Sequence, residues 1–198
     1  VVKDACEAGI NIIVSGAGLP TNLPEFTQNF KEIALVPIVS SAKALKIICK
    51  RWLQRYERLP DAVVLEGPLS GGHQGFTYEQ CLDPEFSLFN LIPQVKAEIK
   101  EWGDFPLIAA GGIWDKNDIE KAISLGANGV QMGTRFIGTH ECDADIGFKE
   151  VLLAAEEKDI ELIKSPVGYP ARGIRTNLIN LVDKRMGPKI QCISNCVS

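Results

Sequence analysis

The segments Pro106-Leu-Ile-Ala-Ala-Gly-Gly-Ile113 and Gly126-Ala-Asn-Gly-Val-Gln-Met-Gly-Thr-Arg-Phe136 decide the fold. Each contains a short apolar run that ends in glycine, and the amphipathic stretch Lys116–Leu125 lies between the two runs. A buried strand, a helix and a second buried strand in this order predict a right-handed βαβ unit with parallel strands.

The same alternation extends through the rest of the chain. Apolar runs without polar interruptions are typical of strands covered on both faces, and they occur at Ile10–Ser15, Leu35–Ser40, Ala62–Glu66, Pro106–Ala110 and Gly129–Met132. Stretches with apolar residues at helical spacing occur at Ala42–Tyr56, Phe89–Trp102 and Lys116–Leu125. We therefore expect five parallel strands with helices between them, and we expect a sixth apolar run, Ile160–Ile163, to be peripheral.

The ends of one helix are marked in the sequence. Asp115 precedes Lys116–Leu125, and Asp118 lies in the first turn, which predicts an N-terminal cap. Gly126 follows the last apolar position and is expected to end the helix in a left-handed conformation.

The positions of the glycines distinguish two α/β architectures. A doubly wound sheet and a barrel both fit the alternation, but a doubly wound sheet needs special loops only at its switch point. Here glycines follow strands along the whole chain, at the rim where a barrel builds its site: Gly16, Gly18, Gly67, Gly71, Gly72, Gly111, Gly112 and Gly133. The pattern favours a (β/α)8 TIM-type barrel forming a single domain over residues 1–198. Because such barrels take about 250 residues, we expect the barrel in this chain to be incomplete.

Composition limits the classes of function. The chain has 198 residues, of which 45% are hydrophobic, and a net charge of −4, so it can bury a core and has no electrostatic reason to bind nucleic acid or a membrane. No signal peptide is visible in this sequence, and no apolar run approaches the roughly 20 residues that span a bilayer. We expect a cytoplasmic protein.

The six cysteines do not form a disulfide framework or a metal site in this interpretation. Cys6, Cys49, Cys81 and Cys142 are scattered through helix-like and strand-like segments, which indicates reduced thiols. Cys192 and Cys196 lie in a polar tail without a further Cys or His nearby, so no metal site is predicted there and their role is left open.

The glycines after the last two strands predict a phosphate site. Gly111 and Gly112 follow one strand, and Gln131-Met-Gly-Thr134 ends the next. Glycine lets backbone N–H groups approach a phosphate closely, and the Thr134 hydroxyl adds a donor. The structural alternative is that Gly111, Gly112 and Gly133 only form tight corners, but two such loops on consecutive strands favour phosphate. The pattern is neither a P-loop nor a dinucleotide fingerprint.

A histidine among glycines forms the second candidate site. His73 lies in Glu66-Gly-Pro-Leu-Ser-Gly-Gly-His-Gln-Gly-Phe76, directly after a predicted strand. Imidazole ordinarily exchanges protons near neutral pH, which suits proton transfer or hydrogen bonding to an anion. The alternative is a surface histidine without a role. His140 lies in a segment without such glycines and is interpreted as structural.

The ordered set of these segments resembles the nitronate monooxygenase family, formerly called 2-nitropropane dioxygenases. The resemblance rests on Ser15-Gly-Ala-Gly-Leu-Pro20, Pro60-Asp-Ala-Val-Val-Leu-Glu-Gly67, Gly71-Gly-His-Gln-Gly75, Ala109-Ala-Gly-Gly-Ile113 and Gln131-Met-Gly-Thr-Arg-Phe136. Glu141-Cys-Asp143 and Ser165-Pro-Val-Gly168 extend it over essentially the whole chain.

The resemblance implies a (β/α)8 barrel that binds FMN without a covalent bond and oxidises a nitronate or nitroalkane with O2 to a carbonyl compound and nitrite. It assigns His73 as the active-site histidine and Gly67 and Gly72 as glycines near the flavin ring. It assigns the FMN phosphate to Gly112, with its neighbour Gly111, and to Gln131, Met132, Gly133 and Thr134. The family's N-terminal strands, with their flavin loop, have no counterpart in this sequence, so the resemblance implies an incomplete barrel whose N-terminal strands are absent from this chain.

Two alternatives to a nitronate-oxidising enzyme stay open. The first is an FMN-dependent NAD(P)H reductase acting on an enoyl-acyl-carrier protein or a quinone, because related sequences share the Gly-Gly-His-x-Gly loop. The second is a flavin-binding module without turnover. A homodimer is left open beside a monomer.

Overall fold

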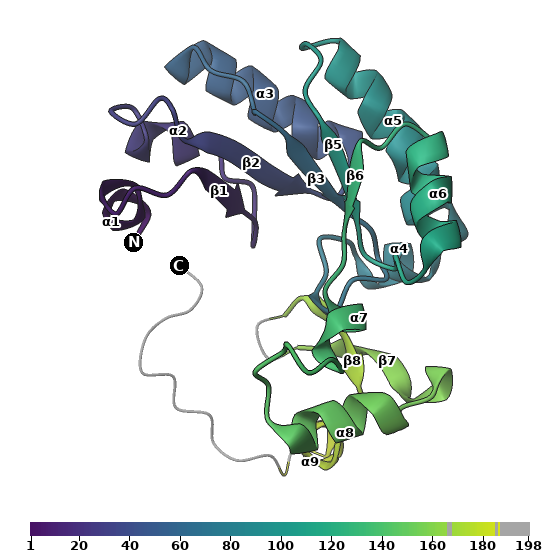
Figure 1. Ribbon diagram of the computed structural model, residues 1–198. Coiled ribbons are helices and arrows are strands. Elements are labelled where there is room, and N and C mark those ends of the chain that lie inside the picture. The colour runs from purple at the N-terminus through teal and green to yellow at the C-terminus, as the bar shows by residue number, and fades with distance from the viewer. Residues whose placement is uncertain (166–167, 185, 187–198) are drawn as a thin grey trace. The chain divides into compact units, whose positions relative to one another are not determined.

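The computed structural model describes residues 1–165, 168–184 and 186. These residues form two compact units (Figure 1). Unit 1 consists of Val1–Ser70 and Gly75–Gly133, and unit 2 consists of Gly71–Gln74 and the described residues from Thr134 onward. The expectation of a single domain remains a prediction.

Unit 1 is built on a parallel sheet. The sheet has the order β1-β2-β3-β5-β6, with β1 Ile12–Ser15, β2 Ala34–Val39, β3 Val63–Glu66, β5 Leu107–Ala110 and β6 Gly129–Gln131. Every neighbouring pair is parallel. The five predicted strands are confirmed, and their bounds lie within two residues of those expected. Their parallel pairing and their order along the chain are also confirmed.

Three long helices lie on one side of this sheet (Figure 1). They are α3 Ala42–Tyr56, α5 Leu88–Lys100 and α6 Lys116–Ser124, and they match the three predicted helices. Unit 1 also contains shorter helices, which were not predicted because one or two turns are too short to show a periodic pattern: α1 Val2–Glu7, α2 Leu23–Phe26, α4 Tyr78–Leu82 and the 3₁₀ helix η1 Pro84–Phe86.

The predicted ends of α6 are confirmed. The Asp115 carboxylate accepts hydrogen bonds from the backbone N–H groups of Asn117 at 2.8 Å and Asp118 at 3.1 Å. The Asp118 carboxylate in turn accepts one from the Asp115 N–H, which completes a reciprocal capping box. Gly126 follows the helix with a φ of +110°, a conformation that costs other residues steric strain.

The core of unit 1 lies between the sheet and the three long helices. Leu45, Ile48 and Trp52 of α3 are completely buried, as are Val63 and Leu65 of β3. Side chains alternate across a strand, so the neighbouring residue Val64 points to the other face, where it forms a smaller cluster with Val36 and Ala110. Ile12 and Val14 of β1 are exposed.

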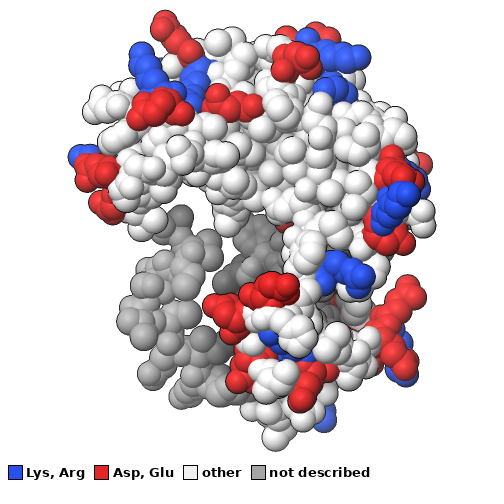
Figure 2. Space-filling model, viewed as in Figure 1, with Lys and Arg blue, Asp and Glu red and all other residues white. Residues whose placement is uncertain are grey.

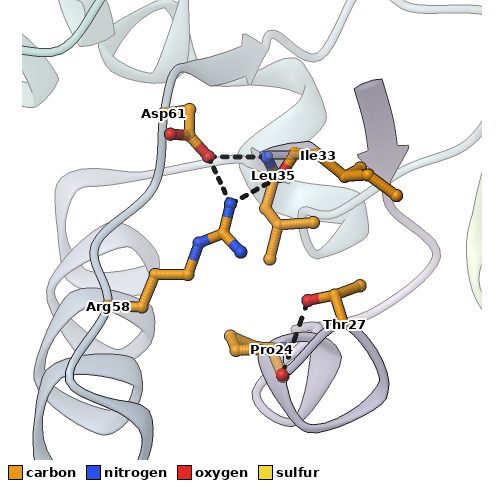
Figure 3. A network of polar contacts seen from close by, with 6 residues as sticks. All are labelled: Pro24, Thr27, Ile33, Leu35, Arg58 and Asp61. Carbon is orange, nitrogen blue, oxygen red and sulfur yellow. Dashed lines mark hydrogen bonds and ion pairs between the residues drawn. The ribbon is translucent and has the colours of Figure 1, made fainter. Parts of the chain in front are cut away.

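A polar clamp fixes the start of β2 (Figure 3). The Asp61 carboxylate accepts hydrogen bonds from the Leu35 N–H at 2.7 Å and from the Arg58 guanidinium at 2.9 Å. The same guanidinium donates to the Ile33 carbonyl. Arg58 and Asp61 lie between α3 and β3. The clamp therefore connects the start of β2 to the segment that precedes β3.

Unit 2 contains a small antiparallel sheet. Its order is β4-β8-β7, with β4 Gly72–His73, β8 Pro170–Ile174 and β7 Ile160–Lys164. The apolar run Ile160–Ile163 therefore lies outside the five-stranded sheet, as predicted. The helices of unit 2 are α7 Thr134–Ile137, α8 Ile146–Ala154, the 3₁₀ helix η2 Glu157–Asp159 and α9 Asn177–Asp183.

Strand β4 was not predicted. Two residues carry no periodic signal, and their partner strand β8 begins almost a hundred residues later in the chain. The pairing exists only because the β7–β8 hairpin offers an open edge for Gly72 and His73.

Polar interactions connect the elements of unit 2. The Arg175 guanidinium donates to the Glu161 carboxylate at 2.6 Å and to the Asp183 carboxylate at 2.9 Å. The Lys149 ammonium of α8 donates to the Thr139 carbonyl at 2.9 Å and to the Cys142 carbonyl. These bonds hold α9 to β7 and the segment before α8 to that helix.

The structure describes four of the six cysteines. Cys6, Cys49 and Cys81 are buried, Cys142 is half-buried, and all four are free. Cys192 and Cys196 lie outside the described residues. Among the helices of the described chain, none is long and apolar enough to cross a membrane.

Candidate functional site

The carboxyl ends of three strands of unit 1 form one row. Glu66 of β3 is in register with Ala110 of β5, and Ala110 is in register with Gln131 of β6. Side chains in register on parallel strands point to the same face, so Glu66 and Gln131 lie on one face with the small Ala110 between them. The glycine segments predicted to bind phosphate continue directly from this row.

Gly67 and Gly111 pack against each other at the corner above β3 and β5. A Cβ on Gly111 would lie 2.7 Å from the Gly67 carbonyl oxygen and 3.1 Å from the Ser70 nitrogen, and the φ of Gly111 is +86°. The Gly67 N–H also donates to the Ala110 carbonyl at 2.8 Å. Backbone packing is thus sufficient to explain the glycine at 111. A Cβ on Gly67 would lie 2.7 Å from the Leu88 Cβ, so packing also explains the glycine at 67.

Gly133 differs from those two glycines. A Cβ on Gly133 would meet no atom of the described residues within 4 Å, and the φ of Gly133 lies outside the left-handed region. Gly112 has a φ of +89°, and a Cβ there would approach the Leu69 side chain at 2.9 Å. Within the described chain, the N–H groups of Gly112 and Gly133 make no hydrogen bond. Packing therefore explains the glycine at 112 but gives no reason for the glycine at 133.

The remaining predicted phosphate residues divide between the two units. Gln131 is exposed at the end of β6, and Met132 is half-buried beside it. Thr134 is exposed and begins α7 in unit 2. Unit 1 thus brings Gly111, Gly112, Gln131, Met132 and Gly133 to the carboxyl ends of two adjacent strands.

Glu66 adds a titratable group to the row. Its side chain is half-buried at the end of β3, and desolvation by burial raises the pKa of its carboxyl above the ordinary value. A carboxyl with a raised pKa at the site edge of a parallel sheet can hold a proton that an exposed carboxyl would lose.

His73 lies in unit 2, where β4 holds its backbone. His73 is exposed, and its register partner on β8 is Ala171. Its Nε2 atom is 3.0 Å from the Ser165 Oγ, a hydrogen bond whose direction depends on the imidazole tautomer. The imidazole of His73 is thus exposed to solvent, and one of its ring nitrogens forms a hydrogen bond.

Gly72 precedes His73 with a φ of +80° and has open space around it. It is in register with Arg172 of β8. A positive φ at this position turns the chain into β4, so the conformation of Gly72 contributes to the orientation of His73. The candidate site residues are divided between the two units. Unit 1 contains Glu66, Gly67, Gly111, Gly112, Gln131 and Gly133, and unit 2 contains Gly72, His73 and Thr134.

Glu66 and Ser165 were not predicted as site residues. Glu66 could have been found from its position as the last residue of a buried strand, directly before a glycine loop. Ser165 had no comparable signal, because 92 positions separate it from His73 and only the pairing of β4 with β8 brings the two together.

Other reactive groups of the described chain do not form a site. No group of three or more His, Cys, Asp or Glu side chains that could hold a metal occurs among the described residues. Burial raises the pKa of the Cys49 thiol to about 12, and Glu98 adds to this effect, so this thiol is protonated and unreactive. On the face shown in Figure 2, charges of both signs are interspersed, and no extended positive area appears over the described residues.

Comparison with known proteins places this arrangement in a family. The chain is 39% identical over 118 residues to a probable nitronate monooxygenase of Bacillus subtilis (strain 168), an alignment that covers 60% of this chain and 33% of that protein. It is 34% identical over 126 residues to one of Staphylococcus saprophyticus, covering 63% of this chain and 34% of that protein. The chain thus matches about a third of the length of these curated relatives.

Solved structures show the same fold. FabK from Thermotoga maritima has a TM-score of 0.74 and 30% identity, covering 92% of this chain and 52% of that one. A nitroalkane oxidase from Streptomyces ansochromogenes has a TM-score of 0.69 and 22% identity, covering 94% of this chain and 51% of that one, and this likeness concerns the fold alone. The predicted fold class, α/β of the TIM-barrel type, is confirmed. The nitronate monooxygenase family model matches residues 1–198, and the chain belongs to the nitronate monooxygenase family.

Proposed function

We propose that this chain belongs to an FMN-dependent enzyme that oxidises nitronates, and nitroalkanes deprotonated in its site, with O2 to carbonyl compounds and nitrite. Family membership supports the chemistry. The observation that carries the assignment concerns Gly112 and Gly133, which follow adjacent strands. Among the described residues, Gly133 has open space beside it and the N–H groups of both glycines make no hydrogen bond.

The residues of unit 1 fit a phosphate monoester. Among the residues that the structure describes, Gly133 has open space beside it and two N–H groups have no acceptor. These features meet the two requirements of a phosphate dianion, which are room and donors. Gln131 and Met132 flank these donors on β6, and Thr134 adds a hydroxyl directly after Gly133. We assign one phosphate to this segment, which favours FMN over FAD.

FMN, when bound, supplies one-electron and oxygen chemistry that protein side chains lack. Gly67 and Gly72 are the glycines that the family resemblance assigns to the flavin ring, and they are part of this proposal. The role of His73 is to take the proton from the carbon acid when the substrate is a neutral nitroalkane. A preformed nitronate needs no such step.

The first experiment replaces Gly133 with valine in the full-length protein. Since a Cβ there meets no protein atom, Gly133→Val should fold like the wild type but lose FMN affinity by at least about tenfold, or about 1.4 kcal/mol. Gly173→Val is a matched control, because Gly173 also has open space and an ordinary φ. FMN binding is measured by flavin fluorescence titration of the apoprotein. Unchanged affinity in Gly133→Val contradicts the phosphate assignment.

The flavin itself is identified by denaturing the purified protein and separating the released cofactor. FMN is the expected result. Release of FAD, or a folded full-length protein that retains no flavin after reconstitution, contradicts the proposal.

An FMN-dependent NAD(P)H reductase is the second candidate function, and the likeness to FabK supports it. Its substrates would be an enoyl thioester or a quinone. Oxygen uptake that depends on nitronate and not on NADH supports the first function. NADH consumption that depends on an enoyl thioester or quinone supports the second. Tight FMN binding without either activity indicates a flavin-binding module.

A further inference from the structure

Three strands of unit 2 place His73 and Ser165 on the same face of the antiparallel sheet. His73 is in register with Ala171, and Ala171 is in register with Ile163. Ser165 follows Ile163 by two residues, so alternation of side chains brings it to the face of His73. The residue between them, Ala171, is small enough to let the imidazole reach across to the serine.

Ser165 is anchored independently of His73. It is only 7% exposed, its N–H donates to the Tyr169 carbonyl at 3.1 Å, and its carbonyl accepts from the Gly168 N–H at 2.9 Å. The His73 backbone is likewise fixed in β4. A hydrogen bond between two side chains on fixed backbones loses little conformational freedom when it forms, so it can hold the imidazole in one orientation.

The bond uses Nε2 and thereby distinguishes the two ring nitrogens. Among the described residues, no hydrogen bond to the His73 Nδ1 is seen. A neutral imidazole has one N–H donor and one acceptor nitrogen. If Nε2–H donates to the Ser165 oxygen, then Nδ1 carries the lone pair, and this bond persists when the ring becomes an imidazolium.

We propose that Ser165 is a positioning residue for His73, which holds the tautomer with hydrogen on Nε2 and leaves Nδ1 as the base. This inference rests on the proposed function of His73. In the step, the substrate C–H bond breaks and its electron pair stays on the substrate as the nitronate. The proton forms a new N–H bond at Nδ1, and Ser165 accepts from Nε2–H before and after the transfer.

The first test detects the ring protons directly by NMR of the full-length protein with ¹⁵N-labelled histidine. The signals of His73 are assigned by their loss in His73→Gln. In the wild type, Nε2 should carry a resolved proton and Nδ1 none. In Ser165→Ala this proton should exchange with water and its resonance should be lost, whereas Ser165→Thr, which keeps a hydroxyl, should restore it. Thr139→Val is the control, because it removes a hydroxyl of unit 2 that bonds to the Phe136 carbonyl at 2.9 Å and does not contact His73.

The second test compares kcat for a neutral nitroalkane and for its preformed nitronate. Ser165→Ala should lower kcat with the neutral substrate on the order of 10–100-fold and leave kcat with the nitronate unchanged, with rescue by Ser165→Thr. Equal losses on both substrates, with an unchanged melting temperature, contradict the positioning role, as does a wild-type spectrum with the proton on Nδ1. A wild type that keeps the Nε2 proton but oxidises neither substrate overturns the proposed function and leaves the orientation of the ring by Ser165 standing.

Discussion

Unit 1 and unit 2 are stabilised by different kinds of interaction. Nearly every buried apolar side chain of the described chain belongs to unit 1, with Trp52, Leu45 and Ile48 among those that solvent does not reach. In the described part of unit 2, only Gln74, Ser165 and Ala171 are buried. Its connections are instead the ion pairs of Arg175, the Lys149 hydrogen bonds and the short antiparallel ladder.

Helix α8 shows this contrast most clearly. It exposes a series of large apolar side chains: Ile146, Phe148, Val151 and Leu153. By comparison, α3 and α5 of unit 1 bury their apolar stripes against the parallel sheet. Under the proposed function, unit 1 binds the phosphate and unit 2 carries His73, which is a division of roles between the two units. The following predictions test that division.

The largest effect is expected for the chemistry of unit 2. His73→Ala should reduce turnover of neutral nitroalkanes on the order of 10²–10⁴-fold, because that step needs a base. Turnover of preformed nitronates should fall far less, and the melting temperature should stay near that of the wild type since the side chain is exposed. Steady-state kinetics with both substrates provide the measurement. Equal losses on both would show that His73 orients the anion and does not take the proton.

The next effect is expected in the core of unit 1. Trp52 is 0% exposed and its indole N–H donates to the Pro20 carbonyl at 2.9 Å. Trp52→Ala should therefore lower the free energy of unfolding by about 3–5 kcal/mol. Phe148→Ala in α8, where the ring is 55% exposed, should change it by less than about 0.5 kcal/mol. Urea denaturation of both variants compares the two units, and a large loss in Phe148→Ala would contradict the difference between them.

Two helix caps give a smaller and matched comparison. Asp115 caps α6 in unit 1 through two N–H groups, and Asp145 caps α8 in unit 2 through the Gly147 N–H at 2.8 Å. Replacement of either by alanine should cost about 1 kcal/mol of helix stability. Only Asp115→Ala should lower the unfolding transition of unit 1. Thermal denaturation followed by tryptophan fluorescence would report it, because Trp52, Trp102 and Trp114 all lie in unit 1. A comparable effect of Asp145→Ala on that signal would mean that the units unfold as one.

The smallest effect concerns Glu66. Burial raises the pKa of the Glu66 carboxyl in the folded state above the ordinary value of 4.5. Between 4.5 and the folded-state pKa, the folded protein therefore binds more protons than the unfolded chain. The free energy of unfolding falls as pH rises through this interval. Glu66→Gln removes this titration. The variant should therefore gain stability relative to the wild type as pH rises above 4.5, and the gain should level off above the folded-state pKa. Denaturation at a series of pH values measures it, and a pH-independent difference would argue against a raised pKa.

Local patterns accounted for most of unit 1. The bounds of α3 were predicted as observed, because its apolar stripe and its flanking residues are contained within one stretch of sequence. The five parallel strands were predicted for the same reason. The capping residues of α6 were found because a cap depends on neighbours three residues away.

The glycines show where local patterns were not sufficient. Gly111 and Gly133 look alike in the sequence, since each follows an apolar strand. Only the structure distinguishes them. A Cβ on Gly111 would clash with Gly67 and Ser70, whereas a Cβ on Gly133 would meet no atom of the described residues. The difference is decided by which backbone segments approach each other, and that depends on strands far apart in the chain.

By itself, the sequence determined the parallel α/β organisation, and it predicted which segments bind phosphate and that His73 is the base, because each of these inferences depends on residue types at short spacing. Only the tertiary structure decided that His73 lies on an antiparallel strand, that Ser165 is its hydrogen-bond partner, and that Glu66 is half-buried in a row with Gln131. Pairing between distant strands and the loss of solvent around a carboxyl arise from the packing of the folded chain, and a local sequence pattern does not encode either one.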